Sequence, residues 1–196
     1  MEMIRLHDPR EGEMRVAGLM SGSGTNLRRI LEFEREMQKE GGCPFHVVVI
    51  FSDRCDSNAA RIGADFDLPV VTRDIDAFYR ARGRKKRDMT TRPEFDEATT
   101  RALKPYRVDV AAYAGYMSIA SPVLTDAYLG VNVHPADLSI EQGGRRRYVG
   151  DHAVRDAIAA GETTIASTTH LIENEVDGGR LLMISAPLDV HLPPGA

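Results

Sequence analysis

The chain has 196 residues, of which 42% are hydrophobic and 28% are charged, as in ordinary globular proteins. Its formal net charge of -4 gives no reason to expect nucleic acid or an anionic membrane as a partner. The two cysteines, Cys43 and Cys55, suggest neither a disulfide framework nor a metal site, and without a membrane-length apolar run we expect a cytoplasmic protein.

The chain is long enough for one α/β domain, which we expect to cover residues 1–196. Residues 1–13 are polar and form a loose leader before the first predicted strand, residues 15–20. The glycine-rich turn Ser21–Asn26 follows at once, and apolar residues then recur at helical spacing until Gly41 ends the helix. This order indicates the opening of a doubly wound sheet, in which the turn offers free N–H groups to an anion.

The residues of the turn restrict the kind of anion. A nucleotide P-loop needs a lysine after its glycines, and none follows here. Leu27 stands where a dinucleotide fingerprint has its third glycine, which argues against an NAD-dependent oxidoreductase. A small phosphate held by Gly24, Thr25 and Asn26 fits better, and the alternative is a tight turn without a ligand.

Strands and helices alternate through the next hundred residues. The predicted strands are residues 46–51, 69–71, 108–114 and 130–133, and the predicted helices are residues 56–66, 76–82, 92–103 and 121–128. The basic run Arg84–Arg87 indicates a solvated surface. The pattern predicts an α/β fold with a doubly wound, mostly parallel twisted sheet and helices on both faces.

The periodicity is lost after Pro135. Residues 141–150 indicate a mobile loop whose three adjacent arginines face water in preference to gripping a phosphate or carboxylate. A helix over 151–160, an alternating strand over 164–172, an acidic turn over 173–179 and a strand over 181–187 follow. The last two strands predict a C-terminal antiparallel hairpin.

Asn132 and His134 close the strand before Pro135 and lie two residues apart, so in an extended chain their side chains point to the same face. An amide donor beside an imidazole can hold a developing oxyanion and move a proton. The alternative is an asparagine that caps a turn and a histidine satisfied by a neighbour. His170 lies in the middle of a predicted strand, where packing is more frequent than catalysis.

Three motifs together carry a resemblance: Ser21–Asn26, Asn132-Val133-His134-Pro135 and Asp177-Gly178-Gly179. In this order and spacing the chain resembles the glycinamide ribonucleotide formyltransferase family, from about Arg15 to Val190. The resemblance implies a Rossmann-like fold and transfer of a formyl group from formyl-tetrahydrofolate to the amine of glycinamide ribonucleotide in purine biosynthesis. It implies small-molecule substrates only (a phosphoribosyl amine and a reduced folate), no metal, no nucleic acid or membrane partner, and a monomer or homodimer.

The resemblance also implies residue roles. Asn132 would donate to the formyl oxygen, His134 would act as the general acid, and Asp177 would orient His134 and relay protons through water. Gly24, Thr25 and Asn26 would hold the substrate phosphate. The residues implied at the folate site are Arg92, Met117, Ile119, Leu138, Glu173 and Val176.

The chain departs from the family after the His-Pro pair, where it has Ala136-Asp137-Leu138-Ser139 and a longer, arginine-rich loop. It also ends at Ala196, before the usual C-terminal helix of the family. These departures keep two alternatives open. One is a folate-dependent formyltransferase for another amine, such as an amino sugar nucleotide, and the other is a non-catalytic ligand-binding protein of the same fold.

Overall fold

The structure is a computed structural model, which describes residues 7, 8, 10 and 12–192. It divides into two compact units, residues 1–130 and 131–196, and each is described by itself. This division does not decide whether residues 1–196 form one domain, so that expectation stays a prediction. Much of the predicted leader, residues 1–6, 9 and 11, lies outside the described residues, as do residues 193–196.

The first unit alternates strands and helices. Its strands are β1 (Met14–Met20), β2 (Phe45–Ser52), β3 (Val70–Thr72) and β4 (Val110–Tyr113). Its helices are α1 (Thr25–Glu40), α2 (Ala59–Phe66), α3 (Ile75–Ala81), α4 (Arg92–Leu103), the 3-10 helix Lys104–Tyr106 and α5 (Pro122–Thr125). The helix predicted over 92–103 has these bounds, with Pro93 in its first turn, whereas the helix predicted over 121–128 is shorter.

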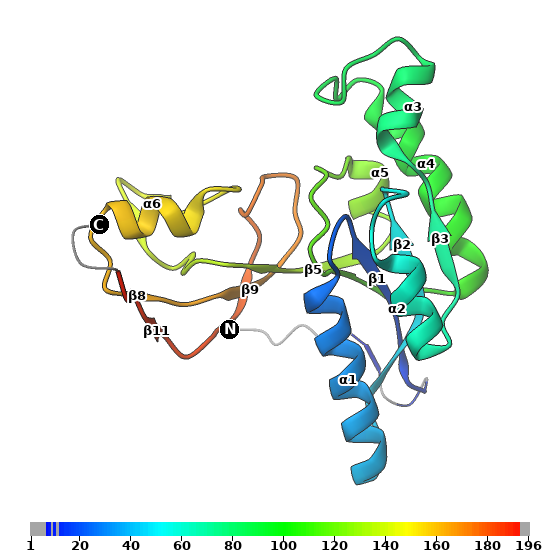
Figure 1. Ribbon diagram of the computed structural model, residues 1–196, viewed down its shortest axis with the longest axis horizontal. Coiled ribbons are helices and arrows are strands. Elements are labelled where there is room, and N and C mark those ends of the chain that lie inside the picture. The colour runs from blue at the N-terminus through cyan, green and yellow to red at the C-terminus, as the bar shows by residue number, and fades with distance from the viewer. Residues whose placement is uncertain (1–6, 9, 11, 193–196) are drawn as a thin grey trace. The chain divides into compact units, whose positions relative to one another are not determined.

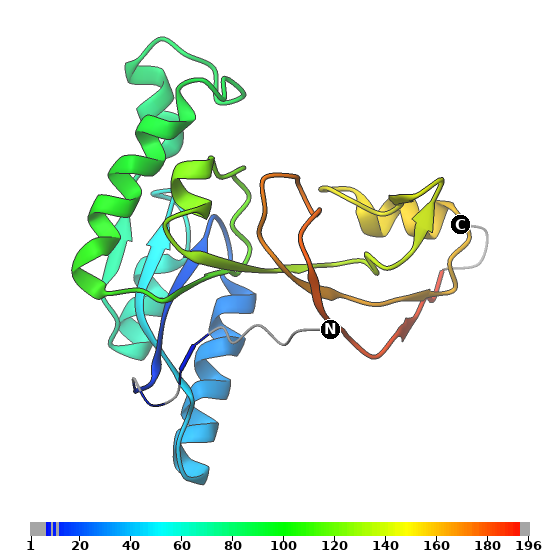
Figure 2. The ribbon, with the colours of Figure 1, turned by 180° about the vertical axis from the view of Figure 1, so that it is seen from behind.

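The four strands of this unit are parallel and lie in the order β4-β1-β2-β3. Helices α1 and α2 cover the face that Figure 1 presents, and α4 covers the face that Figure 2 presents. Residues 47–51 of β2 are all buried, as expected for a strand covered on both faces. The prediction of a doubly wound, mostly parallel sheet with helices on both faces is confirmed.

The second unit is mainly antiparallel. Its elements are β5 (Leu129–His134, from Val131 onward), β6 (Glu141–Gln142), β7 (Arg145–Arg146), α6 (Ala153–Ala159), β8 (Thr164–Ile165), β9 (Thr168–Leu171), β10 (Leu181–Ile184) and β11 (Leu188–Asp189). Strand β9 pairs with β5 on one side and with β10 on the other. The predicted C-terminal antiparallel hairpin is confirmed as the β9–β10 pair.

Two predictions for this unit were wrong in detail. Residues 141–150 do not form an irregular loop, because β6 and β7 pair as a short hairpin. Gly143 and Gly144 connect the two strands, both with positive φ (62° and 75°), as a two-residue primed turn requires. The single strand predicted over 164–172 is divided into β8, which pairs with β11, and β9.

A small apolar core supports the second unit. Ala136, Tyr148, Ala153 and Ala157 are buried together, and Ile140 and Ile165 pack against them. This cluster ties the segment after His134 to α6. In the part of the chain that the structure describes, no helix has both the length and the apolar character needed to cross a bilayer.

Candidate active site

The glycine turn of the first unit ends at a backbone position that requires glycine. Gly24 precedes α1 with φ of 68°, which favours glycine, and a Cβ there would come within 2.7 Å of Met20 Cε. No side chain caps the N-terminus of α1, and its first turn contains no acidic residue. The turn therefore keeps N–H groups available for an anion.

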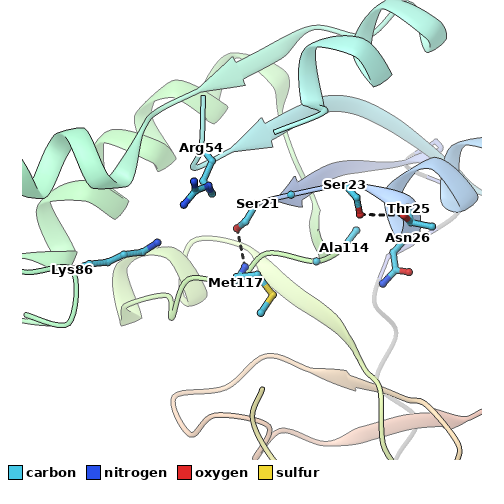
Figure 3. A pocket seen from close by; sticks show the side chains of 11 residues that line it. Ser21, Ser23, Thr25, Asn26, Arg54, Lys86, Ala114 and Met117 are labelled. Carbon is cyan, nitrogen blue, oxygen red and sulfur yellow. Dashed lines mark hydrogen bonds between the residues drawn. The ribbon is translucent and has the colours of Figure 1, made fainter. Parts of the chain in front are cut away.

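A pocket of about 430 Å³ opens beside this turn. Its lining residues are Ser21, Gly22, Ser23, Gly24, Thr25, Asn26, Arg54, Lys86, Ala114, Gly115 and Met117. The two charged residues among them are both cations, and Figure 3 shows Arg54 and Lys86 reaching into the space next to Ser21. This charge suits an anionic ligand.

The sequence analysis missed both cations. Lys86 belongs to the run predicted as solvated surface and is exposed there, but its Nζ also lies 3.6 Å from Asp76 Oδ1. Arg54 Nη1 lies 3.2 Å from Asp76 Oδ2. One carboxylate thus holds both cations at the pocket wall, an arrangement that charge counting along the chain does not reveal.

The second unit brings His134 and Asp177 together from distant parts of the sequence. His134 is buried at the end of β5, and its Nδ1 lies 3.4 Å from Asp177 Oδ2. Its Nε2 donates to the carbonyl oxygen of Tyr148 at 2.8 Å. Because that carbonyl can only accept, Nε2 carries a hydrogen, and a proton on Nδ1 would be shared with Asp177.

Asp177 is held as a carboxylate. Burial disfavours its charge, but the neighbouring His134 and His170 rings and the hydrogen bond from the Gly150 N–H lower its pKa well below the ordinary value of 3.8. Gly150 N donates to Asp177 Oδ2 at 2.7 Å. Asp177 is therefore ionised at neutral pH, and its Oδ2 can accept a hydrogen bond from a protonated His134 Nδ1.

Asn132 joins the cluster through His170. The two residues face one another across the β5–β9 pair, and Asn132 Nδ2 lies 3.1 Å from His170 Nε2. The same His170 nitrogen lies 3.6 Å from Asp177 Oδ1. His170 is buried, as expected for packing, but it also links the amide to the carboxylate, a role that sequence reasoning did not assign to it. An amide nitrogen carries two hydrogens, so one remains for a ligand oxygen.

The backbone explains the two glycines that follow Asp177. Asp177 has a φ of 53°, a left-handed conformation that costs a non-glycine residue roughly 1 kcal/mol or more. Next to it, a Cβ on Gly178 would come within 2.7 Å of Glu175 Cβ, and one on Gly179 would overlap the carbonyl oxygen of Leu171. The sequence Asp-Gly-Gly is thus the one that lets this turn close.

The residues predicted at the folate site lie in different surroundings. Met117 and Ile119 are exposed, and Met117 lines the pocket beside the glycine turn. Glu173 and Val176 are exposed in the turn before Asp177. Leu138 and Arg92 are buried, and Arg92 donates to Asp96 and to the Tyr116 hydroxyl, both at 2.9 Å. These contacts hold Arg92 within the first unit, so its role with folate stays a prediction without support from them.

The described residues contain no group of three or more His, Cys, Asp and Glu side chains arranged to hold a metal ion. The groups that the second unit brings together are an amide, an imidazole and a carboxylate. A donor for an oxyanion beside an imidazole–carboxylate pair suits acyl transfer.

Comparison with known proteins agrees with this chemistry. The family model described as formyl transferase matches residues 14–190. Phosphoribosylglycinamide formyltransferase of Mycobacterium tuberculosis is 30% identical over 179 residues, which cover 90% of this chain and 72% of that protein. The Haemophilus influenzae protein of the same name is 28% identical over 171 residues, 86% of this chain and 70% of the relative.

A solved structure is similar over nearly the whole chain. The crystal structure of glycinamide ribonucleotide transformylase 1 from Symbiobacterium toebii superposes with a TM-score of 0.73 at 28% identity. The match covers 92% of this chain and 75% of the other. The formyltransferase-type, Rossmann-like fold is thereby confirmed. This chain belongs to the formyl transferase family, and within it to the phosphoribosylglycinamide formyltransferases.

Proposed function

We propose that this protein transfers a formyl group from formyl-tetrahydrofolate to the amine of glycinamide ribonucleotide, a step of purine biosynthesis that takes place in the cytoplasm. The family and its relatives support this reaction. The observation that carries it is the cluster of Asn132, His134 and Asp177 within the second unit. His134 Nδ1 lies 3.4 Å from Asp177 Oδ2, and His170 Nε2 lies 3.1 Å from Asn132 Nδ2 and 3.6 Å from Asp177 Oδ1.

In the proposed reaction the acceptor nitrogen attacks the formyl carbon, and a tetrahedral centre with a negative oxygen forms. The free amide hydrogen of Asn132 stabilises that oxygen, a contribution worth roughly 3–4 kcal/mol in comparable acyl-transfer sites. The bond from carbon to the folate nitrogen then breaks, and that nitrogen takes up a proton while the acceptor nitrogen loses one.

The hydrogen bonds of His134 identify the proton that moves. Nε2–H is held by the Tyr148 carbonyl, so we assign the mobile proton to Nδ1, where it is shared with Asp177. The charge of Asp177 stabilises the imidazolium, and a water molecule relays the proton to and from the reacting nitrogens. The Asp177 side chain is only 9% exposed, so few water molecules can reach the shared proton.

The acceptor's phosphate is assigned to the pocket of the first unit. Gly24, Thr25 and Asn26 offer N–H groups, and Arg54 and Lys86 add positive charge. A volume of about 430 Å³ exceeds that of a phosphate alone and accommodates a sugar phosphate. The second substrate is formyl-tetrahydrofolate, and the exposed apolar side chains of Met117 and Ile119 are assigned as contacts for it.

A panel of acceptors tests the proposal. Purified protein is given formyl-tetrahydrofolate with glycinamide ribonucleotide, with an amino sugar nucleotide, or with no acceptor, and the formylated product is identified by mass spectrometry. We expect product with the ribonucleotide. Product with the amino sugar nucleotide alone would show that the enzyme is a formyltransferase with that acceptor. No product with either acceptor would contradict formyl transfer.

A further inference from the structure

The segment Arg146–Gly150 contacts the His134–Asp177 pair at three alternate residues. The Arg146 guanidinium donates to the backbone carbonyl of Asp177. The carbonyl of Tyr148 accepts from His134 Nε2 at 2.8 Å, and the N–H of Gly150 donates to Asp177 Oδ2 at 2.7 Å. Residues 146, 148 and 150 are more buried than the exposed residues 145, 147 and 149 between them. The three less exposed residues are the ones that contact the pair.

The segment is fixed at both of its ends. At one end, the Gly143–Gly144 turn pairs Arg146 with Glu141 in the β6–β7 hairpin. At the other end, Tyr148 is buried in the core of the second unit, and its hydroxyl donates to Glu162 Oε1 at 2.7 Å. Residues 146–150 of the arginine-rich loop therefore form a fixed support for the cluster, called the frame below.

Asp177 needs such a frame because its backbone is held in the left-handed region, at φ of 53°. Its carboxylate is positioned by the backbone N–H of Gly150, which only a substitution by proline would remove. Its carbonyl is held by a side chain, that of Arg146, which fixes the orientation of the adjoining peptide. Truncation of the Arg146 side chain therefore removes the support of the Asp177 carbonyl directly.

We propose that Arg146 is a positioning residue for the catalytic pair, which it orders by holding the carbonyl of Asp177. This inference rests on the proposed function for the consequence in catalysis, but the positioning itself is a property of the fold. Arg145 faces the other side of β7 and is exposed, so it is a matched control of the same charge and neighbouring position.

The first test needs no substrate. Spectra are recorded by two-dimensional NMR on protein labelled with 15N in its histidine rings, of which the chain has six, and the His134 signals are assigned with H134N. We expect R146A to shift the His134 ring signals and R145A to leave them in place. R146K, which can still donate to a carbonyl, should retain most of the wild-type spectrum. Unshifted His134 signals in R146A would overturn the inference.

The second test separates positioning from substrate binding. R146A should lower kcat about tenfold to a hundredfold, the size expected for a misplacement of about 1 Å, with the KM of each substrate little changed. In a D177N background, where the backbone can stay but the carboxylate is gone, R146A should cost little further. A fall in kcat that is equally large in both backgrounds would show that Arg146 does not act through Asp177 and would overturn the inference.

The outcomes distinguish this inference from the proposed function. Absence of formyl transfer in the wild type, together with the expected NMR shifts, would leave Arg146 as a positioning residue and reject the reaction. Normal transfer by R146A with unshifted signals would reject the positioning role and leave the reaction. Thermal unfolding of R146A and R146K shows that the compared proteins are folded.

Discussion

At the scale of single residues, Asn132 is the group expected to carry the oxyanion. One of its amide hydrogens faces His170, and the other is free for the formyl oxygen. Replacement of Asn132 by Ala should lower kcat roughly 100- to 1,000-fold with little change in KM, since the donor acts mainly in the transition state. Steady-state kinetics measures the split, and a kcat within a factor of two of the wild type would remove Asn132 from the mechanism.

Asp177 gives an expectation for stability as a function of pH. Its pKa in the folded protein is lowered by His134, His170 and the Gly150 N–H despite its burial. An acid with a lowered folded pKa contributes stability that is present above its unfolded pKa and is lost as the pH falls below about 3.8. D177N should therefore be less stable than the wild type at neutral pH, and the difference should shrink below pH 4.

Urea unfolding of the two proteins at a series of pH values measures this difference. Asn also tolerates the left-handed conformation, so the comparison isolates the carboxylate from the turn. A difference that is constant from pH 7 down to pH 3 would show that the charge of Asp177 does not contribute to stability.

At the scale of elements, the turn between β1 and α1 and the basic run after α3 meet at one pocket. Lys86 lines this pocket, beside Arg54 and Asp76. K86A should raise the KM for the phosphorylated acceptor about twofold to fivefold, the effect of a partly exposed ion pair, and leave the KM for folate unchanged. High salt should reduce the effect, because exposed charges are screened.

Lys85 is the matched control for this element, since it is exposed and adjacent in sequence but does not line the pocket. Kinetics at two salt concentrations compares K85A with K86A. An equal change in both variants would point to general surface charge, and no change in either would remove the basic run from acceptor binding.

The β6–β7 hairpin shows why an element was misread. Gly143-Gly144 between two short polar segments is a hairpin signal, but neither flank has the apolar alternation that usually identifies strands. The hairpin is instead stabilised by contacts distant in sequence, from Arg146 to Asp177 and from Tyr148 to the core around α6. The local pattern of apolar and polar residues cannot predict such contacts.

At the scale of the whole molecule, buried apolar strands and glycine or proline at helix ends were sufficient to predict the parallel sheet and its helices. The same reasoning placed Asn132 and His134 on one face of a strand, and β5 carries both residues into the cluster. Asp177 was found through a resemblance, because nothing in its own segment distinguishes a catalytic carboxylate from a hairpin turn.

The roles of the remaining residues could not have been found from sequence patterns. His170 enters the cluster through strand pairing, Lys86 reaches the pocket through an ion pair, and Arg146 contacts Asp177 across 31 positions of sequence. Each depends on a tertiary contact between polar groups. Polar groups of this kind carry no periodicity, so a pattern search has no signal with which to detect them.

The central claim is that His134 and Asp177 act as one unit in formyl transfer. The most direct measurement is the single-turnover rate of formyl transfer to glycinamide ribonucleotide by the wild type, H134N, D177N and the double variant. Each single change should slow transfer roughly 100- to 10,000-fold, and the double variant should be no slower than the slower single variant. A wild-type rate in H134N, or two losses that multiply in the double variant, would contradict the account.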